Sequence, residues 1–285
     1  MKLLHRRQFL SVAGLGGAAA LGGAAAWLAE QARRYGRERA LRLKILSLQA
    51  EVVAAKIDQF IGEIESQIGW TTQFPWSVGT IDQWRLVGSR LLRQVPAITK
   101  LSQLDAAGKV QASLSRLVIA EPDRPEDYNY SHDPKFTEAV ARGVYYGPIY
   151  FQRGSEPYMT LALAGRRRDA GVSVAEVSLK LLQDLITAIR VSEHSEAFVI
   201  NAEGRLIAHP DISLVLRNTD LTKLTHVIAA RAAAAGETQE PVQEAEDLQG
   251  RKVLTAYAPV AKLGWLVFVE LPTRVLFARA MMNGS

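Results

Sequence analysis

The chain has 285 residues, of which 48% are hydrophobic, so it is long enough for one large domain or two ordinary domains with packed cores. Residues 1–44 hold nine Lys and Arg against two Glu, and the remainder holds 25 basic and 27 acidic residues, so the net charge of +5 belongs to the N-terminus. This removes the main support for nucleic-acid binding, and the absence of cysteine excludes disulfides and cysteine metal sites.

An uncharged run from Phe9 to Ala29 follows the basic start MKLLHRR. Its 21 residues are close to the length that crosses the hydrocarbon core, so we expect residues 1–29 to direct the chain to or across the membrane. The start HRRQFLSVAG resembles the twin-arginine export signal. A cleaved signal and an uncleaved anchor both fit, which puts the remainder in the periplasm or anchored to the inner membrane facing it. The Lys and Arg of residues 33–44 would by themselves favour the opposite orientation.

Residues 30–75 are predicted to form one long amphipathic helix. There is no proline between Glu30 and Gln73, and apolar residues recur at alternating spacings of four and three, at Leu41, Ile45, Leu48, Val52, Val53, Ile57, Ile61, Ile64 and Ile68. The helix is longer than most globular helices, so part of this stripe is expected to pack on the domain and part to pair with a second copy. A stripe that faces only the core would give the same pattern, so a homodimer is one of two interpretations.

After Pro75 the sequence predicts a short helix over 81–94 and then elements typical of antiparallel sheets. A first set comprises strands over 97–105, 109–119, 144–151, 157–165 and 171–178, a helix over Pro134–Arg142 capped by Asp133, and a helix over 179–190. A second set comprises strands over 197–201, 205–209, 251–259 and 265–271, a helix near 220–234 and a polar linker, GETQEPVQEAED. The expected fold class is therefore α+β, with two tandem antiparallel-sheet units that separate near 190–195.

Four segments, in this order, resemble the double Cache (dCache) extracytoplasmic sensor region of bacterial transmembrane receptors. They are YYGPIYFQRGSEPYMTLALAG, GVSVAEVSLKLLQDLI, EAFVINAEGRLIAHPDISLVLRNTDL and GRKVLTAYAPVAKLGWLVFVELP. The resemblance implies a long helix that carries two PAS-like units, a membrane-distal unit over 76–192 and a membrane-proximal unit over 193–275, followed by a tail over 276–285. The small-molecule pocket usually lies in the distal unit.

Relatives of this kind are the sensor portions of histidine kinases or nucleotide cyclases, in which a second membrane span follows. No second apolar run follows residue 275 here, so we expect this chain to lack a cytoplasmic output of its own and to signal through a partner kinase or cyclase. The expected function is extracytoplasmic small-molecule sensing. The alternative is a periplasmic binding protein that delivers its ligand to a separate receptor or transporter.

Strand alternation suggests the residues that line the pocket. Counting by twos puts Tyr158 and Thr160 on one face of their strand, and Val172, Val174 and Glu176 together on the next. A carboxylate among apolar neighbours is costly to bury unpaired, so Glu176 is the first candidate, with the role of accepting hydrogen bonds from a ligand amine or hydroxyl. Exposure of Glu176 to solvent, or pairing with an internal arginine, is the alternative. The remaining candidates are Tyr130, His132, Tyr146 and Tyr150, since tyrosine joins an apolar ring to a polar tip.

The ligand class is narrowed by one departure from the family pattern. Amino-acid-binding members carry an Arg-x-Trp-Tyr run before the short helix and an Asp near the position of Glu176, whereas this chain has Asp133-Pro134-Lys135-Phe136. Without a guanidinium to clamp an α-carboxylate, an α-amino acid is not the expected ligand. Neither HExxH nor GxSxG occurs, so no metal, cofactor or enzymatic activity is expected, and an exported enzyme is the least favoured alternative. His209, at the end of a predicted strand, is expected to be structural.

Overall fold

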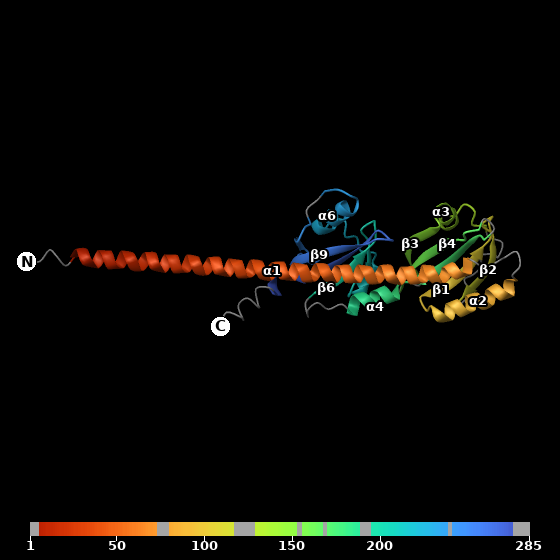
Figure 1. Cartoon of the computed structure of the whole chain (residues 1–285), viewed down its shortest axis with the longest axis horizontal. Helices are drawn as coiled ribbons and strands as arrows, with labels where there is room; N and C mark the ends of the chain where they lie inside the picture. Colours follow the sequence, from red (N-terminus) through yellow and green to blue (C-terminus); the bar gives the residue numbers. More distant parts are fainter. Residues whose placement is uncertain are drawn as a thin grey trace, which may run out of the picture.

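The chain folds into one long helix that carries two sheet units along one half of its length (Figure 1). This computed structural model describes residues 6–72, 80–116, 129–152, 156–167, 170–188, 195–238 and 241–275. Each sheet is antiparallel and has five strands, with short helices packed on both faces. The predicted α+β class with two tandem antiparallel units is confirmed.

Helix α1 (Arg6–Thr72) is continuous over 67 residues, so the apolar run and the amphipathic stretch form one element. The sheet units contact its C-terminal half, and its N-terminal half projects beyond them (Figure 1). Within the described ranges, no helix combines the length and apolarity needed to cross a membrane. The first five residues of the expected export segment and the expected tail over 276–285 lie outside those ranges.

The first unit comprises the first sheet and the helices α2, α3 and α4. Its elements are α2 (Ile81–Gln94), β1 (Ile98–Leu104), β2 (Val110–Ser115), α3 (Pro134–Arg142), β3 (Val144–Gln152), β4 (Glu156–Ala164), β5 (Val172–Ser178) and α4 (Lys180–Ala188). The strand order is β2-β1-β5-β4-β3, which puts β5 in the centre. Helix α3 begins where the sequence predicts, because the Asp133 side chain accepts a hydrogen bond from the Lys135 N–H and Pro134 occupies the first turn.

The second unit repeats this arrangement with a smaller set of elements. They are β6 (Glu196–Ile200), β7 (Leu206–Ala208), α5 (Ile212–Leu216), α6 (Thr225–Ala234), β8 (Glu244–Glu246), β9 (Lys252–Val260) and β10 (Trp265–Pro272). The order β7-β6-β10-β9-β8 matches that of the first sheet strand for strand, so β10 corresponds to β5 and β9 to β4. Strand β8 lies in the segment predicted to be a polar linker. It forms because an edge strand needs only backbone pairing to β9, and its outer side chains face water.

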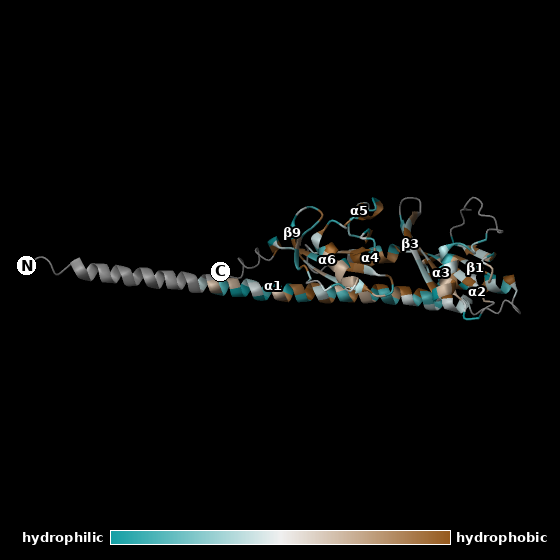
Figure 2. Ribbon diagram, turned by 90° about the horizontal axis from the view of Figure 1, so that it is seen from above, coloured by the Kyte–Doolittle hydropathy of each residue, from teal (hydrophilic) through white to brown (hydrophobic). Residues whose placement is uncertain are grey.

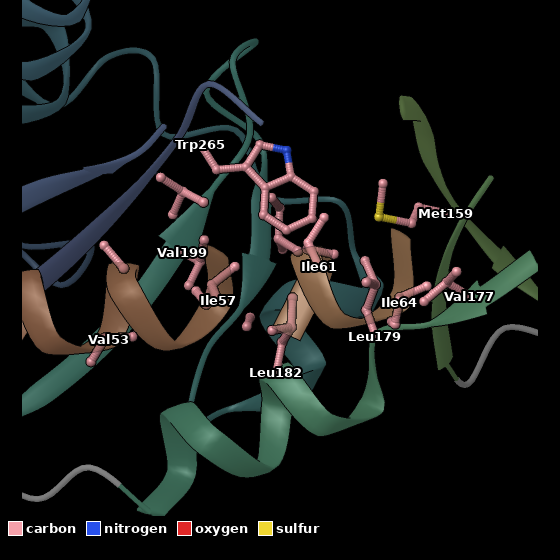
Figure 3. Packing of buried hydrophobic residues seen from close by; sticks show 14 of the residues in the cluster. Val53, Ile57, Ile61, Ile64, Met159, Val177, Leu179, Leu182, Val199 and Trp265 are labelled. Carbon is pink, nitrogen blue, oxygen red and sulfur yellow. The ribbon is translucent and has the colours of Figure 1, made fainter. Parts of the chain in front are cut away.

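One hydrophobic core joins α1 to both sheets. Buried residues recur along α1 from Leu46 to Ile68, and this stripe packs against the near face of each sheet. Figure 3 shows Ile61 of α1 between Trp265 of the second sheet and Leu182 of α4, with Met159 of the first sheet close by. Brown and teal alternate along this part of α1 in Figure 2, as expected for a helix with one apolar face. The two units therefore share one core along α1, and each has a further buried cluster on its other face.

Hydrogen bonds to the backbone of His209, in the second unit, connect it to α4 of the first unit. Its main-chain N–H donates to Gln183 Oε1 of α4 at 3.2 Å, and the Gln183 amide donates to the His209 carbonyl. The imidazole is 6% exposed, and its Nδ1 accepts a hydrogen bond of 2.9 Å from the Asp211 N–H. Since Nδ1 is an acceptor, the neutral ring is the form that fits. His209 thus has a structural role, as the sequence indicates.

Burial lowers the pKa of His209, outweighing the opposing effect of Glu196, whose carboxylate lies 4.0 Å from Nε2. The folded state then binds fewer protons than the unfolded state near the ordinary pKa of 6.5. We expect the free energy of unfolding to fall as the pH drops below 6.5, by at most about 1.4 kcal/mol per pH unit from this group. Urea titrations at pH 7.5, 6.0 and 5.0 measure the effect. The His209→Gln variant should have a flatter pH profile, whereas His132→Ala, at an exposed position, should keep the wild-type profile.

Candidate functional site

The two faces of the first sheet have different surroundings. One face packs on α1 through residues such as Leu161 and Ala175, and the other is covered in part by α3 through Ala162 and Val174. We call the second face the α3 face. Helix α3 covers it with Phe136 and Ala139, both buried, and one end of the face is left to polar side chains. The predicted alternation along β4 and β5 is confirmed by this division.

Glu176 lies on the α3 face near the end of the central strand β5. In the sheet register it is opposite Thr160 of β4 on one side and Lys100 of β1 on the other. The Lys100 Nζ lies 3.8 Å from Glu176 Oε1, and the two side chains are 28% and 23% exposed. The carboxylate is thus half-buried and next to a lysine, and it remains accessible to a solute. Lys100 was not among the sequence candidates, although its alternation within ITKLSQL places it on this face.

Tyr150 and Tyr158 extend the α3 face beyond Thr160. They are opposite each other in the β3–β4 register, and their rings stack with centroids 6.1 Å apart. The Tyr158 hydroxyl donates to Glu156 at 3.1 Å. Burial, followed by this hydrogen bond to Glu156, raises the pKa of Tyr158, so its hydroxyl stays protonated and can serve as a donor. Four of the seven candidates, Glu176, Thr160, Tyr158 and Tyr150, are therefore brought together.

Tyr146 points to the opposite face. It pairs with Leu161, packs against the α1 core and donates its hydroxyl to Glu65 of α1. Counting by twos would put it on the same face as Tyr150, but the pairing register shifts between Tyr146 and Ile149. This irregularity at Gly147-Pro148 reverses the alternation. Burial and the bond to Glu65 raise the pKa of Tyr146, which keeps the contact with α1 intact over the physiological range.

Tyr130 and His132 lie at the entrance to α3. The Tyr130 ring is half-buried, and the ammonium group of Lys135 lies 4.0 Å from its centroid, a cation–π contact. Lys135 also pairs with Asp133 at 3.5 Å, and its side chain is 18% exposed. His132 is exposed in the preceding turn. The segment Asp133-Pro134-Lys135-Phe136 thus provides a partly buried cation on α3.

The polar end of the α3 face therefore combines the carboxylate of Glu176, the hydroxyl of Thr160 and the ammonium group of Lys100 with the rings of Tyr150 and Tyr158. Such a set can bind a small polar molecule through hydrogen bonds to Glu176 and Thr160, with an apolar part against Tyr150 and Tyr158. Hollows among the described residues lie elsewhere, one of them of 460 Å³ between α2 and β2. A groove of 590 Å³ runs between α1 and α4 past Phe60 and Leu181, and a smaller one of 260 Å³ separates the units near Pro148 and Leu263. In the described part of the chain, no three His, Cys, Asp or Glu side chains gather as metal ligands.

Two five-stranded antiparallel sheets of equal strand order on one helix define a tandem α+β fold of two like units. The sequence profile described as the Cache domain (dCache_1) matches residues 37–280. The chain belongs to this family, which confirms the resemblance read from its four segments.

The chain is also similar to solved chemoreceptor structures. The sensory domain of the chemoreceptor Tlp3 of Campylobacter jejuni aligns with a TM-score of 0.66 and 13% identity, covering 85% of this chain and 98% of that one. The ligand-binding domain of the amino acid chemoreceptor PctB of Pseudomonas aeruginosa, in complex with L-Gln, aligns with a TM-score of 0.58 and 18% identity, covering 82% and 93%. At these identities the likeness shows the fold.

A curated relative matches over a short stretch. The methyl-accepting chemotaxis protein PscA of Pseudomonas syringae pv. tomato is 41% identical over 49 residues. The match covers 17% of this chain and 8% of that protein, so the chain spans a small part of its relative's length.

Proposed function

We propose that this chain is an extracytoplasmic sensor module that binds a small molecule on the α3 face of its first unit. The observation that carries the proposal is Glu176, a half-buried carboxylate on the central strand of a Cache domain, with Thr160 and Lys100 on either side. In this arrangement the first unit, over 76–192, is membrane-distal, and the second, over 193–275, is membrane-proximal. Figure 1 supports this order, because the first unit lies at the end of α1 far from the N-terminus.

The ligand we propose is a small polar molecule with a hydrogen-bond donor for Glu176 and an acidic or polar group for Lys100. Among the related structures, PctB is in complex with L-Gln and Tlp3 is in complex with L-valine. The family resemblance puts Asp133 where amino-acid-binding members carry the arginine that clamps an α-carboxylate, and a carboxylate there would repel one. Lys135 is already engaged with Tyr130 and Asp133, which makes it a weaker substitute. We therefore propose a ligand other than an α-amino acid.

A signal from the first unit has a polar route to the second through α1. Glu65 of α1 accepts a hydrogen bond from Tyr146 of β3 and, through its other oxygen, pairs with Lys262 at 2.9 Å. Lys262 is in the turn between β9 and β10, where its N–H and that of Ala261 donate to Asp58 of α1. A shift of β3 on ligand binding would therefore act on α1 and on the second sheet at one carboxylate. A ligand transmits a signal by this route only if it binds the shifted and unshifted positions of β3 with different affinities.

A thermal-shift screen of the full chain tests the proposed function. The library holds small carboxylates, amines, purines and the common α-amino acids, and a specific ligand raises the melting temperature saturably by mass action. A hit outside the α-amino acids supports both the function and the ligand class. A hit confined to α-amino acids keeps the function and overturns the ligand class, whereas a complete absence of hits with folded protein contradicts the function.

A second copy of the chain is the partner we propose for the outer face of α1. Leu41, Leu48 and Val52 are 61%, 46% and 54% exposed, and Ile45 between them is half-buried. Their spacings of four, three and four are those of a two-helix seam, and they lie on the side of α1 away from the buried stripe. The helix thus has one apolar face for the sheets and a second one for a parallel partner.

The dimer is tested by placing a charge in this seam. Leu48→Asp should convert a dimer to a monomer, weakening association at least roughly 100-fold, because a carboxylate in an apolar seam loses its hydration. Sedimentation equilibrium measures the mass. The matched control is Leu181→Asp on α4, which is 53% exposed and outside the seam, and it should leave the dimer unchanged. A dimer that survives Leu48→Asp and dissociates with Leu181→Asp would move the interface to the groove beside α4.

A further inference from the structure

The second unit reproduces the arrangement around Glu176. Glu270, on the central strand β10, lies on the face away from α1, as Glu176 does on β5. In the register Glu270 is opposite Thr255 of β9, just as Glu176 is opposite Thr160 of β4. An acid on the central strand and a threonine on the next strand thus occur at equivalent places in both sheets.

The helix over this face also corresponds. Helix α6 precedes β8 as α3 precedes β3, although α5 separates α6 from β7, and each lies over its own sheet. His226 is the second residue of α6 and Lys135 is the second residue of α3. The next inward residues, Val227 in α6 and Phe136 in α3, are both buried. His226 thus holds the same position in α6 that Lys135 holds in α3.

The two sites differ in what faces the acid. In the first sheet the neighbouring strand β1 supplies Lys100 to Glu176, whereas in the second sheet β6 supplies another carboxylate, Glu196, opposite Glu270. Glu196 has its own partner, since Arg251 lies 3.7 Å away. The N–H group beside Glu270 comes instead from α6: the Nε2 of His226 lies 2.9 Å from Glu270 Oε1, and the two side chains are 1% and 8% exposed.

The contact between His226 and Glu270 is close, but polar atoms of both side chains lack a hydrogen-bond partner among the described residues. The His226 ring meets Phe268 edge-on, with centroids 5.5 Å apart, and its N–H is not aligned on the carboxylate as in a good hydrogen bond. Among the residues that the structure describes, neither His226 Nδ1 nor Thr255 Oγ1 has a hydrogen-bond partner. A buried polar group without a hydrogen-bond partner lowers the stability of the fold. Here such groups occur on three neighbouring side chains, His226, Thr255 and Glu270.

We propose that the second unit contains a second binding site, built like the first, in which the imidazole of His226 takes the place of a ligand. The site would accept a small molecule with an aromatic or amine N–H directed at Glu270, and in the natural chain His226 fills it. The second unit is then permanently in its occupied form, and the first unit alone responds to solutes. This inference does not depend on the ligand of the first unit.

The test removes the internal ligand and supplies it in solution. His226→Ala in the full chain deletes the imidazole and leaves Glu270, Thr255 and Phe268 in place. Free imidazole should then raise the melting temperature saturably, by roughly 3 °C at ten times its dissociation constant, because it binds only the folded state. The wild-type chain, His132→Ala and the double variant with Glu270→Gln should not respond. A folded His226→Ala variant that ignores imidazole, or a wild-type chain that responds equally, overturns the proposal.

A second measurement covers the case in which His226→Ala does not fold. If imidazole restores its folding, the proposal is supported. If it does not, His226→Gln and Glu270→Gln are compared with their double variant by melting temperature. Interacting partners give a double variant that loses less than the sum of the single losses, and additive losses overturn the proposal. Failure of this test leaves the function of the first unit untouched, since Glu176 belongs to the other sheet.

Discussion

Replacing Glu176 by glutamine should weaken binding of the ligand found by the thermal-shift screen by roughly 10- to 100-fold, the usual worth of a hydrogen bond to a charged partner. The substitution keeps the shape of the side chain and removes the charge that lies 3.8 Å from Lys100. Isothermal titration calorimetry on the full chain measures the affinity. The fold should be retained, because Glu176 is only half-buried and no core contact is lost.

Glu246→Gln is the matched control, because Glu246 is an exposed glutamate on the edge strand β8 of the other sheet. It should bind the ligand as the wild-type chain does. A Glu176→Gln variant with unchanged affinity would remove Glu176 from the site. If the Phe60→Ala variant lost binding while Glu176→Gln kept it, the ligand would bind in the groove between α1 and α4.

Replacing Ile61 by alanine should lower the free energy of unfolding of the whole chain by about 2–5 kcal/mol, the range for large-to-small changes in a closed core. Ile61 is 1% exposed and belongs to the stripe of α1 that packs on both sheets. Since the units share this core, both should unfold together at a lower denaturant concentration. Urea unfolding followed by far-UV circular dichroism and by tryptophan fluorescence measures the two stabilities.

Ile228→Ala removes the same atoms from a side chain on α6 that is 48% exposed, and it should change the stability by no more than about 0.5 kcal/mol. Coincident transitions with both probes are the expected result for Ile61→Ala. Two separated transitions, with only one sheet destabilised, would show that the units have independent cores.

The elements of the fold that carry strong local signals could be predicted from the sequence. Helix α3 is the clearest case, since Asp133 and Pro134 mark its start and the structure has it over Pro134–Arg142 as expected. Strands β4 and β5 were found within one residue because their alternation is regular. Strand β8 was missed, because its pairing to β9 is formed by the backbone and leaves no apolar pattern in EAE.

The candidate site was predictable only where alternation is unbroken. Glu176, Thr160 and Tyr158 follow the period of two and lie on one face, whereas the register shift at Gly147-Pro148 sends Tyr146 to the other face. A shift of this kind depends on how two strands pair, which a single segment does not encode. The pair of His226 and Glu270 was also missed, because its members are 44 positions apart in sequence and meet only when α6 lies over β10.

The length of α1 makes it a lever. Its contacts with the second unit begin at Tyr35 and Arg39, so the preceding residues 6–34 of the helix extend about 44 Å beyond the sheets at 1.5 Å per residue. A tilt of about 5° where the sheets hold it would move the far end by about 4 Å, more than the side-chain displacement that a bound solute needs to cause. A stiff arm held at one end turns a small rearrangement near Glu65 into a large excursion at the N-terminus.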